Sequence, residues 1–256
     1  MPGLFKSATA LLSAAAVVTA SPTQRMSKRD IITPLPEGAS DLELKFQPYL
    51  DFDSDGCYNT AAISPDGYTN PGKGPTGTPQ GDCRDPPQLE NSNAYSRSRC
   101  NNGICAIMYE YYFEKDQSVG LSFTGGHRHD WENIVVFTRG EDVIYVAPSC
   151  HTGYNSGNNV ILDGQHPLVV YHKDGGLTHC FRVANGDDQA NPENPTGAFH
   201  RAPLVGWDNW PSVELRDTML QTWNGGVGPK LDDEFTDKLR AAAGTSVPGF
   251  DPAIDG

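Results

Sequence analysis

Five short runs of apolar and aromatic residues most constrain what this chain can fold into, because each has the length of a β-strand and short breaks rich in Gly, Asp and Asn separate them. The runs are residues 105–113, 131–138, 142–147, 167–172 and 179–184. Strands that follow one another this closely, without long intervening helices, favour an antiparallel sandwich. The sequence therefore predicts a mostly β fold, an antiparallel β-sandwich flanked by a few helices.

Two helices are predicted near the C-terminus. Residues 211–223 carry apolar side chains at helical spacing, and residues 232–243 do the same before Gly244, a residue that commonly ends helices. Residues 64–90 are instead rich in Pro and Gly and predict an irregular loop. We find no internal repeat, so one domain is expected.

The first 29 residues are not expected to belong to this domain. A run of small and apolar residues from Ala8 to Ala20 ends in Val-Thr-Ala before Ser21, which is typical of a secretory signal peptide. Lys28-Arg29 then offers a dibasic processing point, with a polar linker as the alternative interpretation. The expected organisation is a signal peptide over residues 1–20, a propeptide over 21–29 and one domain over 30–256 of a secreted, extracellular protein.

The predicted mature chain is strongly acidic. The full sequence has 19 Lys and Arg against 32 Asp and Glu, and removal of residues 1–29 takes away four cations and no acid, which leaves 15 basic residues and a net charge of -17. This charge repels nucleic acid and anionic membrane surfaces, so no nucleic-acid partner is expected. Peripheral membrane contact would need a specific attraction, such as a bound cation or a sugar headgroup.

Six cysteines, an even number in a chain with a secretory leader, predict three disulfides. They are Cys57, Cys83, Cys100, Cys105, Cys150 and Cys180. Sequence alone allows about fifteen pairings, and the spacings do not resemble a zinc ribbon or finger. The turn-like segment between Cys100 and Cys105 favours this pair. Cys57 with Cys83 would then close the loop rich in Pro and Gly, and Cys150 with Cys180 would join two predicted strands.

The side chains best suited to chemistry are concentrated in residues 126–132, which read Gly-His-Arg-His-Asp-Trp-Glu. Asp130 and Glu132 are two residues apart, so on a strand they project to the same side, while Trp131 points the other way and anchors the strand in the core. His127 follows two glycines that let the backbone turn its ring toward the carboxylates. Buried charges at this density must be paired or bind a metal.

A further carboxylate, Asp116, lies near the end of the preceding predicted strand and can approach the same point if the intervening segment is a hairpin loop. The resulting ligand set is Asp116, His127, Asp130 and Glu132. Its hard oxygen donors suit magnesium, calcium or manganese better than zinc or copper, and a divalent cation relieves the repulsion among three carboxylates. Arg128 is expected beside the cation as a salt-bridge partner or as a clamp on an acidic loop, and His129 as a group that orients a carboxylate.

A second acidic segment contains Asp51, Asp53 and Asp55 followed by Gly56, which is how a calcium-binding loop begins. The twelfth position of such a loop should be a bidentate glutamate, and here it is Ala62. An acidic turn and a second calcium site are therefore alternative interpretations of this segment.

Residues 126–132 match letter for letter the GHRHDWE signature of the necrosis- and ethylene-inducing peptide 1-like proteins, the NPP1 family. The chain is similar to this family over roughly Leu42 to Ala243. The segment from Ala106 to Asp116 resembles the family's AIMYxWYFPKD segment, Cys57 and Cys83 resemble its shared cysteine pair, residues 94–97 its N-x-Y-x-R segment, and the stretch from Val205 its C-terminal helical part.

The resemblance implies an actinoporin-like sandwich in a secreted cytolysin, expected to be a monomer and not an enzyme. Such a protein holds a divalent cation at its rim, binds the terminal sugar of plant glycosylinositol phosphorylceramides and permeabilises the plasma membrane, causing necrosis. Carried over by position, the ligands are again Asp116, His127, Asp130 and Glu132. The resemblance adds His151 near this site and marks the segment from Ala106 to Arg128 as one that plant immune receptors recognise.

Departures from the family pattern keep another function open. Tyr111 stands where the family has Trp, Glu114 where it has Pro, and the loop between Asp116 and His127 is longer than in the commonest class. The two extra cysteine pairs are typical of divergent classes, some of whose members are not cytotoxic, so a non-cytotoxic glycolipid-binding protein is one alternative.

A secreted metal-dependent hydrolase is the other alternative. His127, His129 and Asp130 are similar to the H-x-H-x-D run of binuclear hydrolases, in which a metal with an open position activates water. The ligand expected two residues after His129 is Trp131, so this pattern is incomplete.

Overall fold

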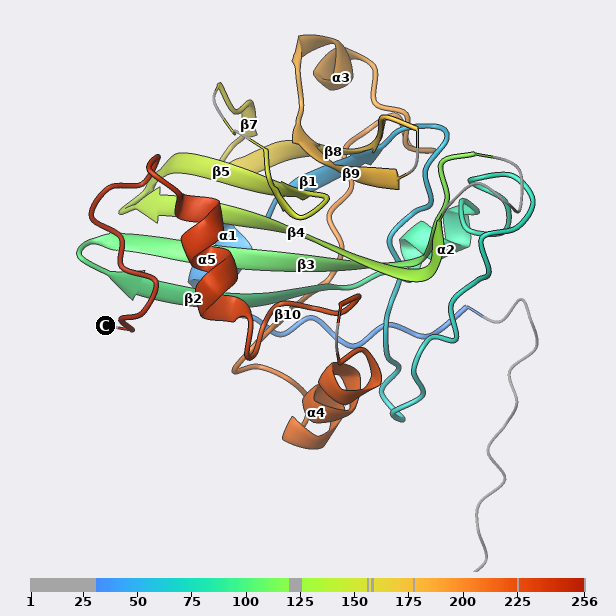
Figure 1. Cartoon of the computed structure of the whole chain (residues 1–256), viewed down its shortest axis with the longest axis horizontal. Coiled ribbons are helices and arrows are strands. Elements are labelled where there is room, and N and C mark those ends of the chain that lie inside the picture. The colour runs from blue at the N-terminus through green and yellow to red at the C-terminus, as the bar shows by residue number, and fades with distance from the viewer. Residues whose placement is uncertain are drawn as a thin grey trace, which may run out of the picture. The chain divides into compact units, whose positions relative to one another are not determined.

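The computed structural model describes residues 31–255 except 120–125, 156, 158, 177 and 225. The predicted signal peptide and propeptide lie outside these residues. Within the described part of the chain, no helix combines the length and apolar character needed to cross a bilayer. The elements of this part form two sheets and five short helices (Figure 1).

The larger sheet has six strands in the order β10-β2-β3-β4-β5-β6. Their bounds are β2 Ala94–Asn101, β3 Ile104–Asp116, β4 His127–Arg139, β5 Asp142–Cys150, β6 Gly153–Tyr154 and β10 Leu204–Gly206. The smaller sheet is centred on β8 (His166–Asp174), which pairs with β1 (Tyr49–Phe52), β7 (Leu162–Asp163) and β9 (Thr178–Val183). The mostly β fold predicted from the sequence is therefore confirmed.

All five predicted runs lie in strands, and β3, β4 and β5 pair with one another in antiparallel fashion, as do β8 and β9. The sheets are nevertheless mixed, because β1 pairs with β8 in parallel and β10 pairs with β2 in parallel. These parallel pairings involve β1, β2 and β10, which the apolar pattern did not indicate.

The two predicted C-terminal helices are present as α4 (Val213–Thr222) and α5 (Phe235–Ala243). Ser212 caps α4, since its hydroxyl accepts a hydrogen bond from the backbone N–H of Leu215. Three further helices are one to two turns long: α1 Asp41–Lys45, α2 Pro86–Glu90 and α3 Gly186–Ala190. Of these, α2 lies at the end of the region predicted to be irregular.

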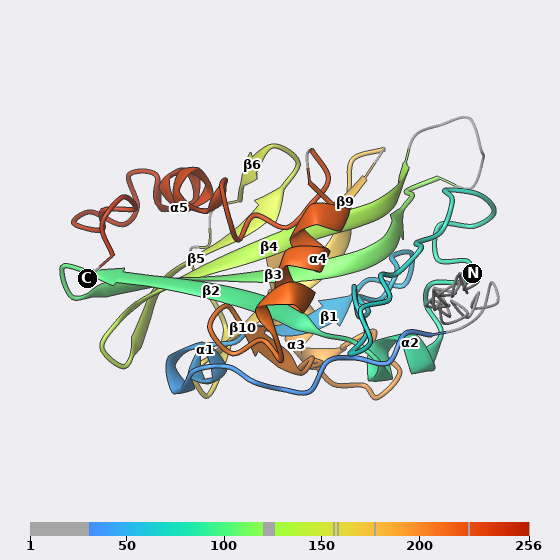
Figure 2. The ribbon, with the colours of Figure 1, turned by 90° about the horizontal axis from the view of Figure 1, so that it is seen from below.

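Both faces of the central β3–β4 pair are buried. Ile134 and Val136 belong to the core shared with the smaller sheet, whereas Val135 and Phe137 belong to the core covered by α4 and α5. Figure 2 shows α5 on one side of β2–β5 and β1 on the other. A strand covered on both faces reads as a continuous apolar run, which is why β3 and β4 are the strongest strand signals in the sequence.

The three disulfides pair as predicted: Cys57–Cys83, Cys100–Cys105 and Cys150–Cys180. Cys100 and Cys105 face each other across the β2–β3 turn. Cys150 ends β5 in the larger sheet and Cys180 lies in β9 of the smaller one, so this disulfide ties the two sheets together at one end of the sandwich.

Candidate metal and sugar site

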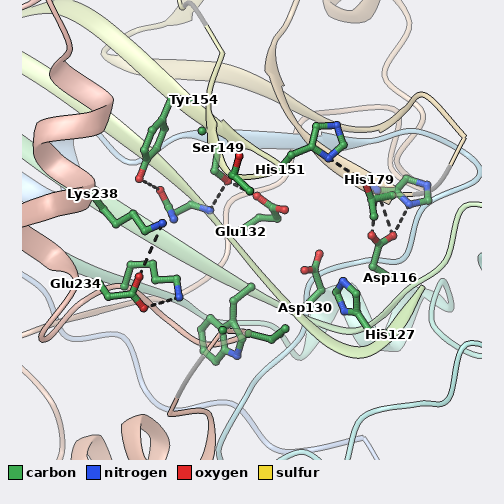
Figure 3. Close-up of a pocket in the computed structure, with 18 residues that line it drawn as sticks. Asp116, His127, Asp130, Glu132, Ser149, His151, Tyr154, His179, Glu234 and Lys238 are labelled. Atoms are coloured by element: carbon green, nitrogen blue, oxygen red, sulfur yellow. Dashed lines mark hydrogen bonds and ion pairs between the residues drawn. The ribbon is translucent and has the colours of Figure 1, made fainter. Parts of the chain in front are cut away.

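A cavity of about 330 Å³ lies at this end of the sandwich, where the first residues of β4 extend beyond the last residue paired with β5 (Figure 3). Its walls come from the end of β3, the start of β4, the β5–β6 connection, the start of β9 and residues 226–238. All four predicted ligands line this cavity: Asp116, His127, Asp130 and Glu132.

The ends of β3 and β4 bring these residues together. Asp116, the last residue of β3, pairs with His127, the first residue of β4, as the predicted hairpin requires. Gly126 has a φ of +104°, and a Cβ atom there would lie 2.5 Å from the carbonyl oxygen of Asp116. Any other residue at position 126 would therefore force the two strand ends apart.

The side chains of Asp130, Trp131 and Glu132 in β4 alternate between the two faces of the sheet. Asp130 reaches Tyr171 of the smaller sheet, whereas Trp131 packs against Tyr112 and Trp223 on the helix-covered side. Glu132 points to the same side as Asp130 and accepts a hydrogen bond from the Ser149 hydroxyl. The predicted orientations of these three β4 residues are thus confirmed.

Asp130 and Glu132 are buried with few donors to hold their charge. Asp130 accepts one hydrogen bond from the Tyr171 hydroxyl at 3.2 Å. Burial is the main cause that raises the pKa of Asp130 to about 7, and the charge of Asp116 is the second. Burial is also the main cause that raises the pKa of Glu132 well above its usual range, and the charge of Asp130 is the second. Both carboxylates are costly to ionise in the protein alone, which is the condition that a bound cation relieves.

Asp116 is held by a residue that sequence reasoning missed. The backbone N–H of His179 lies 3.2 Å from both carboxylate oxygens, and Nδ1 of the same residue lies 2.8 Å from Oδ1. The His179 ring is buried and stacks on Tyr171, which bonds Asp130. Its only sequence signal is its place beside Cys180, whose disulfide fixes β9 at the cavity.

His127 has the form that a metal binds. Its Nδ1 lies 2.6 Å from the carbonyl oxygen of His129. Because a carbonyl only accepts, Nδ1 carries the proton and Nε2 keeps its lone pair in the neutral ring. A backbone carbonyl on the second ring nitrogen is the usual way in which proteins orient a histidine ligand.

The four residues share the cavity without closing around one point. A search of the described residues for three ligand groups whose atoms all lie within 4.8 Å of one another finds only Cys150, Asp174 and Cys180. The two sulfurs of this group are joined in a disulfide. The donor set still fits a hard cation, because it offers three carboxylates and an imidazole, and two of the carboxylates, Asp130 and Glu132, have few donors.

Arg128 and His129 do not take the places expected for them. Within the described residues, Arg128 donates to the carbonyl oxygens of Pro71 and Gly72 instead of to an acid, so it clamps a loop that is not acidic. His129 has a left-handed backbone conformation, with a φ of +61°, and its ring lies on the helix-covered side, where Nδ1 is 2.7 Å from the Tyr112 hydroxyl. Burial lowers the pKa of His129 to about 4.

The position of His129 also bears on the hydrolase alternative. That alternative needs His127, His129 and Asp130 to face one metal pair. His129 packs instead against Tyr112 and Trp223, away from Asp130. The described residues therefore do not assemble the H-x-H-x-D arrangement.

His151 lies at the cavity wall, as expected from the resemblance. Its Nε2 is 2.7 Å from Oδ2 of Asp174, and its Nδ1 is 3.1 Å from the Thr178 hydroxyl. These contacts join the β5–β6 connection to the ends of β8 and β9. His151 is thus placed to hold the rim of the cavity in shape.

The second acidic segment lies close to this site. Nε2 of His179 is 3.5 Å from Oδ1 of Asp55, so one imidazole stands between Asp55 and Asp116. Asp51 is buried, and its carboxylate accepts from the backbone N–H groups of Glu193 and Asn194. A second calcium site at Asp51, Asp53 and Asp55 stays a prediction.

Comparison with known proteins places this site in a family context. The family model described as necrosis inducing protein (NPP1) matches residues 40–242. A necrosis-inducing protein NPP1 of Phytophthora nicotianae is 36% identical over 208 residues, which are 77% of this chain and 79% of that protein. NLP effector protein 10 of Phytophthora capsici is 32% identical over 209 residues, covering 78% and 81% of the two chains.

Solved structures agree with these sequence matches. NLPPya in complex with mannosamine superposes with a TM-score of 0.68 at 29% identity, covering 84% of this chain and 97% of that one, and its complex with glucosamine gives the same values. A non-toxic protein, HaNLP3, superposes with a TM-score of 0.65 at 29% identity, covering 82% and 96%.

Proposed function

This chain belongs to the NPP1 family of necrosis-inducing proteins, and from this premise we propose that it is a secreted, cation-dependent cytolysin. Its target is the sugar headgroup of plant glycosylinositol phosphorylceramides, and its action is to permeabilise the plasma membrane. The observation that carries the proposal is the group of three buried carboxylates and one imidazole that lines a single cavity at the open end of the sandwich.

Asp116, His127, Asp130 and Glu132 hold the divalent cation, magnesium or calcium with manganese as an alternative, and the cation supplies open coordination positions for sugar hydroxyls. Ser149 and Tyr154 bring hydroxyl groups to the same cavity. These hydroxyls suit a ligand with many hydroxyl groups of its own, since each can both donate and accept. The mannosamine and glucosamine complexes of NLPPya support a sugar as the ligand.

Membrane contact in this proposal is peripheral and follows headgroup capture by a monomer. The mature net charge of -17 opposes approach to an anionic surface, so specific binding of the headgroup must supply the attraction.

Recognition by a plant immune receptor through the segment from Ala106 to Arg128 requires release of that segment. Residues 106–116 are almost entirely buried in β3, and a receptor cannot read them in the folded protein.

The proposal is tested with vesicles that contain plant glycosylinositol phosphorylceramide and an entrapped dye. Wild-type protein is expected to release the dye, while Asp130→Ala and chelation with EDTA should each abolish release, because both remove the cation from the cavity. Asp208→Ala, which changes an exposed acid, is the matched control and should behave as wild type. Leakage that persists in both Asp130→Ala and EDTA, with circular dichroism showing an intact fold, refutes the role of the cation.

A non-cytotoxic glycolipid-binding protein is the second candidate, and the similarity to non-toxic HaNLP3 favours it. This candidate keeps cation and headgroup binding but lacks membrane damage. Infiltration of purified protein into leaves of a eudicot and a monocot, beside Asp130→Ala, separates the two functions. Binding to the vesicles without dye release or necrosis would select the second candidate.

A further inference from the structure

The cavity has a second end with the opposite charge. Lys230, Glu234 and Lys238 line it together with the acidic residues. Figure 3 shows Glu234 and Lys238 at one end and Asp116 at the other, with Glu132 and Ser149 between them. One continuous cavity thus connects the proposed cation site to a pair of lysines.

Positive charge exceeds negative charge at this end. Nζ of Lys230 lies 2.7 Å from Oε1 of Glu234, and Nζ of Lys238 lies 3.8 Å from Oε2 of the same residue, so one carboxylate serves two ammonium groups. The side chains of Lys230 and Lys238 are only 12% and 30% exposed. Partial burial weakens solvent screening, and an unmatched charge there attracts an anion more strongly than one on the open surface.

Glu110 is a further acid near this end, and it does not cancel this charge. Its Oε1 accepts a hydrogen bond of 2.8 Å from the backbone N–H of Lys230, which fixes the base of the lysine. The carboxyl is fully buried, and burial raises its pKa to about 8. At neutral pH Glu110 is therefore mostly uncharged.

The region between Glu132 and the lysines is polar and without full charge. Asn133 lies next to Glu132, its backbone N–H donates to the Ser149 hydroxyl at 2.9 Å, and its side-chain oxygen accepts from the Tyr154 hydroxyl at 2.8 Å. Among the described residues that line the cavity, Lys230 and Lys238 are the only lysines, and no arginine lines it. A ligand that fills the cavity would meet carboxylates at one end, amide and hydroxyl groups in the middle and ammonium groups at the other end.

We propose that Lys230 and Lys238 form a subsite for an anionic group, so that the cavity selects a glycan that carries a carboxylate or a phosphate next to the sugar held at the acidic end. This inference rests on the proposed sugar-binding function and assigns the residues that would meet an anionic group of the ligand. Glu234 is 48% exposed, so it can turn into solvent when a ligand anion takes its place between the lysines. In a predicted mature chain of net charge -17, a local pair of cations lets an anionic ligand enter where the overall field repels it.

The experiment is a nuclear magnetic resonance titration of the ¹⁵N-labelled mature protein, in magnesium buffer, with glucose, glucuronate and glucose 1-phosphate. Wild type is expected to bind at least one anionic sugar more tightly than glucose, and the preferred one identifies carboxylate or phosphate as the natural group. Lys230→Gln with Lys238→Gln should reduce the preference, measured as the ratio of Kd values, by about fivefold, as expected for partly exposed ion pairs. Glu234→Gln should increase it, because the competing carboxylate is gone.

Lys45→Gln with Arg201→Gln is the matched control, since each residue pairs with one surface acid and the two changes together also remove two positive charges. Thermal melting of each variant establishes that it is folded. Equal binding of glucose and both anionic sugars by wild type, or a preference unchanged in the double lysine variant, overturns the subsite while the proposed function stands. Failure of wild type to bind any of the three sugars overturns both.

Discussion

Two acidic groups in this molecule look alike in sequence and differ in how the fold treats them. In the first, at the acidic end of the cavity, Asp130 and Glu132 each accept one side-chain hydroxyl. In the second, Asp51 accepts three hydrogen bonds from two backbone N–H groups, at 3.0 to 3.1 Å. Asp53 of the second group lies 3.9 Å from the Arg182 guanidinium.

The difference is one of degree. In the second group backbone donors meet the Asp51 carboxylate, but burial still raises the pKa of Asp51 and raises that of Asp53 to about 6. Asp130 and Glu132 of the first group have fewer donors, which is the state expected of a binding site. Spacing of acids in the sequence cannot distinguish these cases, since the donors come from residues more than a hundred positions away.

His179 joins the two groups. One ring nitrogen lies 2.8 Å from Asp116 of the cavity and the other 3.5 Å from Asp55 of the second group. The comparison is therefore open to test at three points: Asp51 in the second group, His179 between the groups, and Asp130 in the cavity.

Asp51→Ala is expected to have the largest effect, on stability. The substitution leaves the backbone N–H groups of Glu193 and Asn194 without their acceptor in a buried setting, which costs about 3 kcal/mol of unfolding free energy. Urea unfolding measures this loss, with Asp208→Ala as the exposed control. Sugar binding by the folded variant should remain. Loss of binding as complete as that of Asp130→Ala, in protein shown to be folded, would make the two acidic groups one site.

His179→Leu is expected to weaken cation binding about tenfold, because groups that orient a metal ligand typically contribute that much. His179→Asn should recover part of the loss, since its side-chain amide can donate to Asp116 from near the position of Nδ1. Isothermal titration with magnesium and calcium provides the affinities, and thermal melting controls for the fold. Equal affinity in wild type and the leucine variant would reduce His179 to a packing residue.

Much of this site was predictable because its geometry is local. Two-residue alternation placed Asp130 and Glu132 on one side of β4 and Trp131 on the other, and the glycines before His127 allowed the β3–β4 ends to meet. Alternation does not extend to the residues before Asp130: it would turn His127 away from Asp130, whereas both line the cavity and His129 has a φ of +61°. His179 escaped detection because its contact with Asp116 depends on the packing of the two sheets, which a single sequence does not encode in any short pattern.

The short strands were not predicted from the sequence, for a related reason. The parallel strands β1 and β10 are four and three residues long, so they offer too few positions for a periodic pattern. Their pairing depends on long-range contacts with β8 and β2. The larger sheet was predictable at its centre, where β3 and β4 are 13 residues each, and unpredictable at its edges.

Asp130→Asn is expected to have the smallest effect, a gain in stability. The pKa of Asp130 rises from 3.8 to about 7 in the folded protein, chiefly through burial. A group whose pKa is raised by folding contributes stability below pH 3.8 that is lost as the pH rises through about 7. An asparagine carries no charge and escapes that loss. The variant should therefore exceed wild type by about 1–2 kcal/mol at pH 8 without divalent cations, and by nothing near pH 4.

Adding magnesium should reverse the order of the two proteins at pH 8. A ligand that binds only the folded state stabilises it by an amount set by its concentration and affinity, and Asp130→Asn lacks a ligand for the cation. Wild type should then gain stability while the variant does not. A wild type more stable than Asp130→Asn in EDTA at pH 8 would mean that the fold itself compensates the charge of the cavity carboxylate.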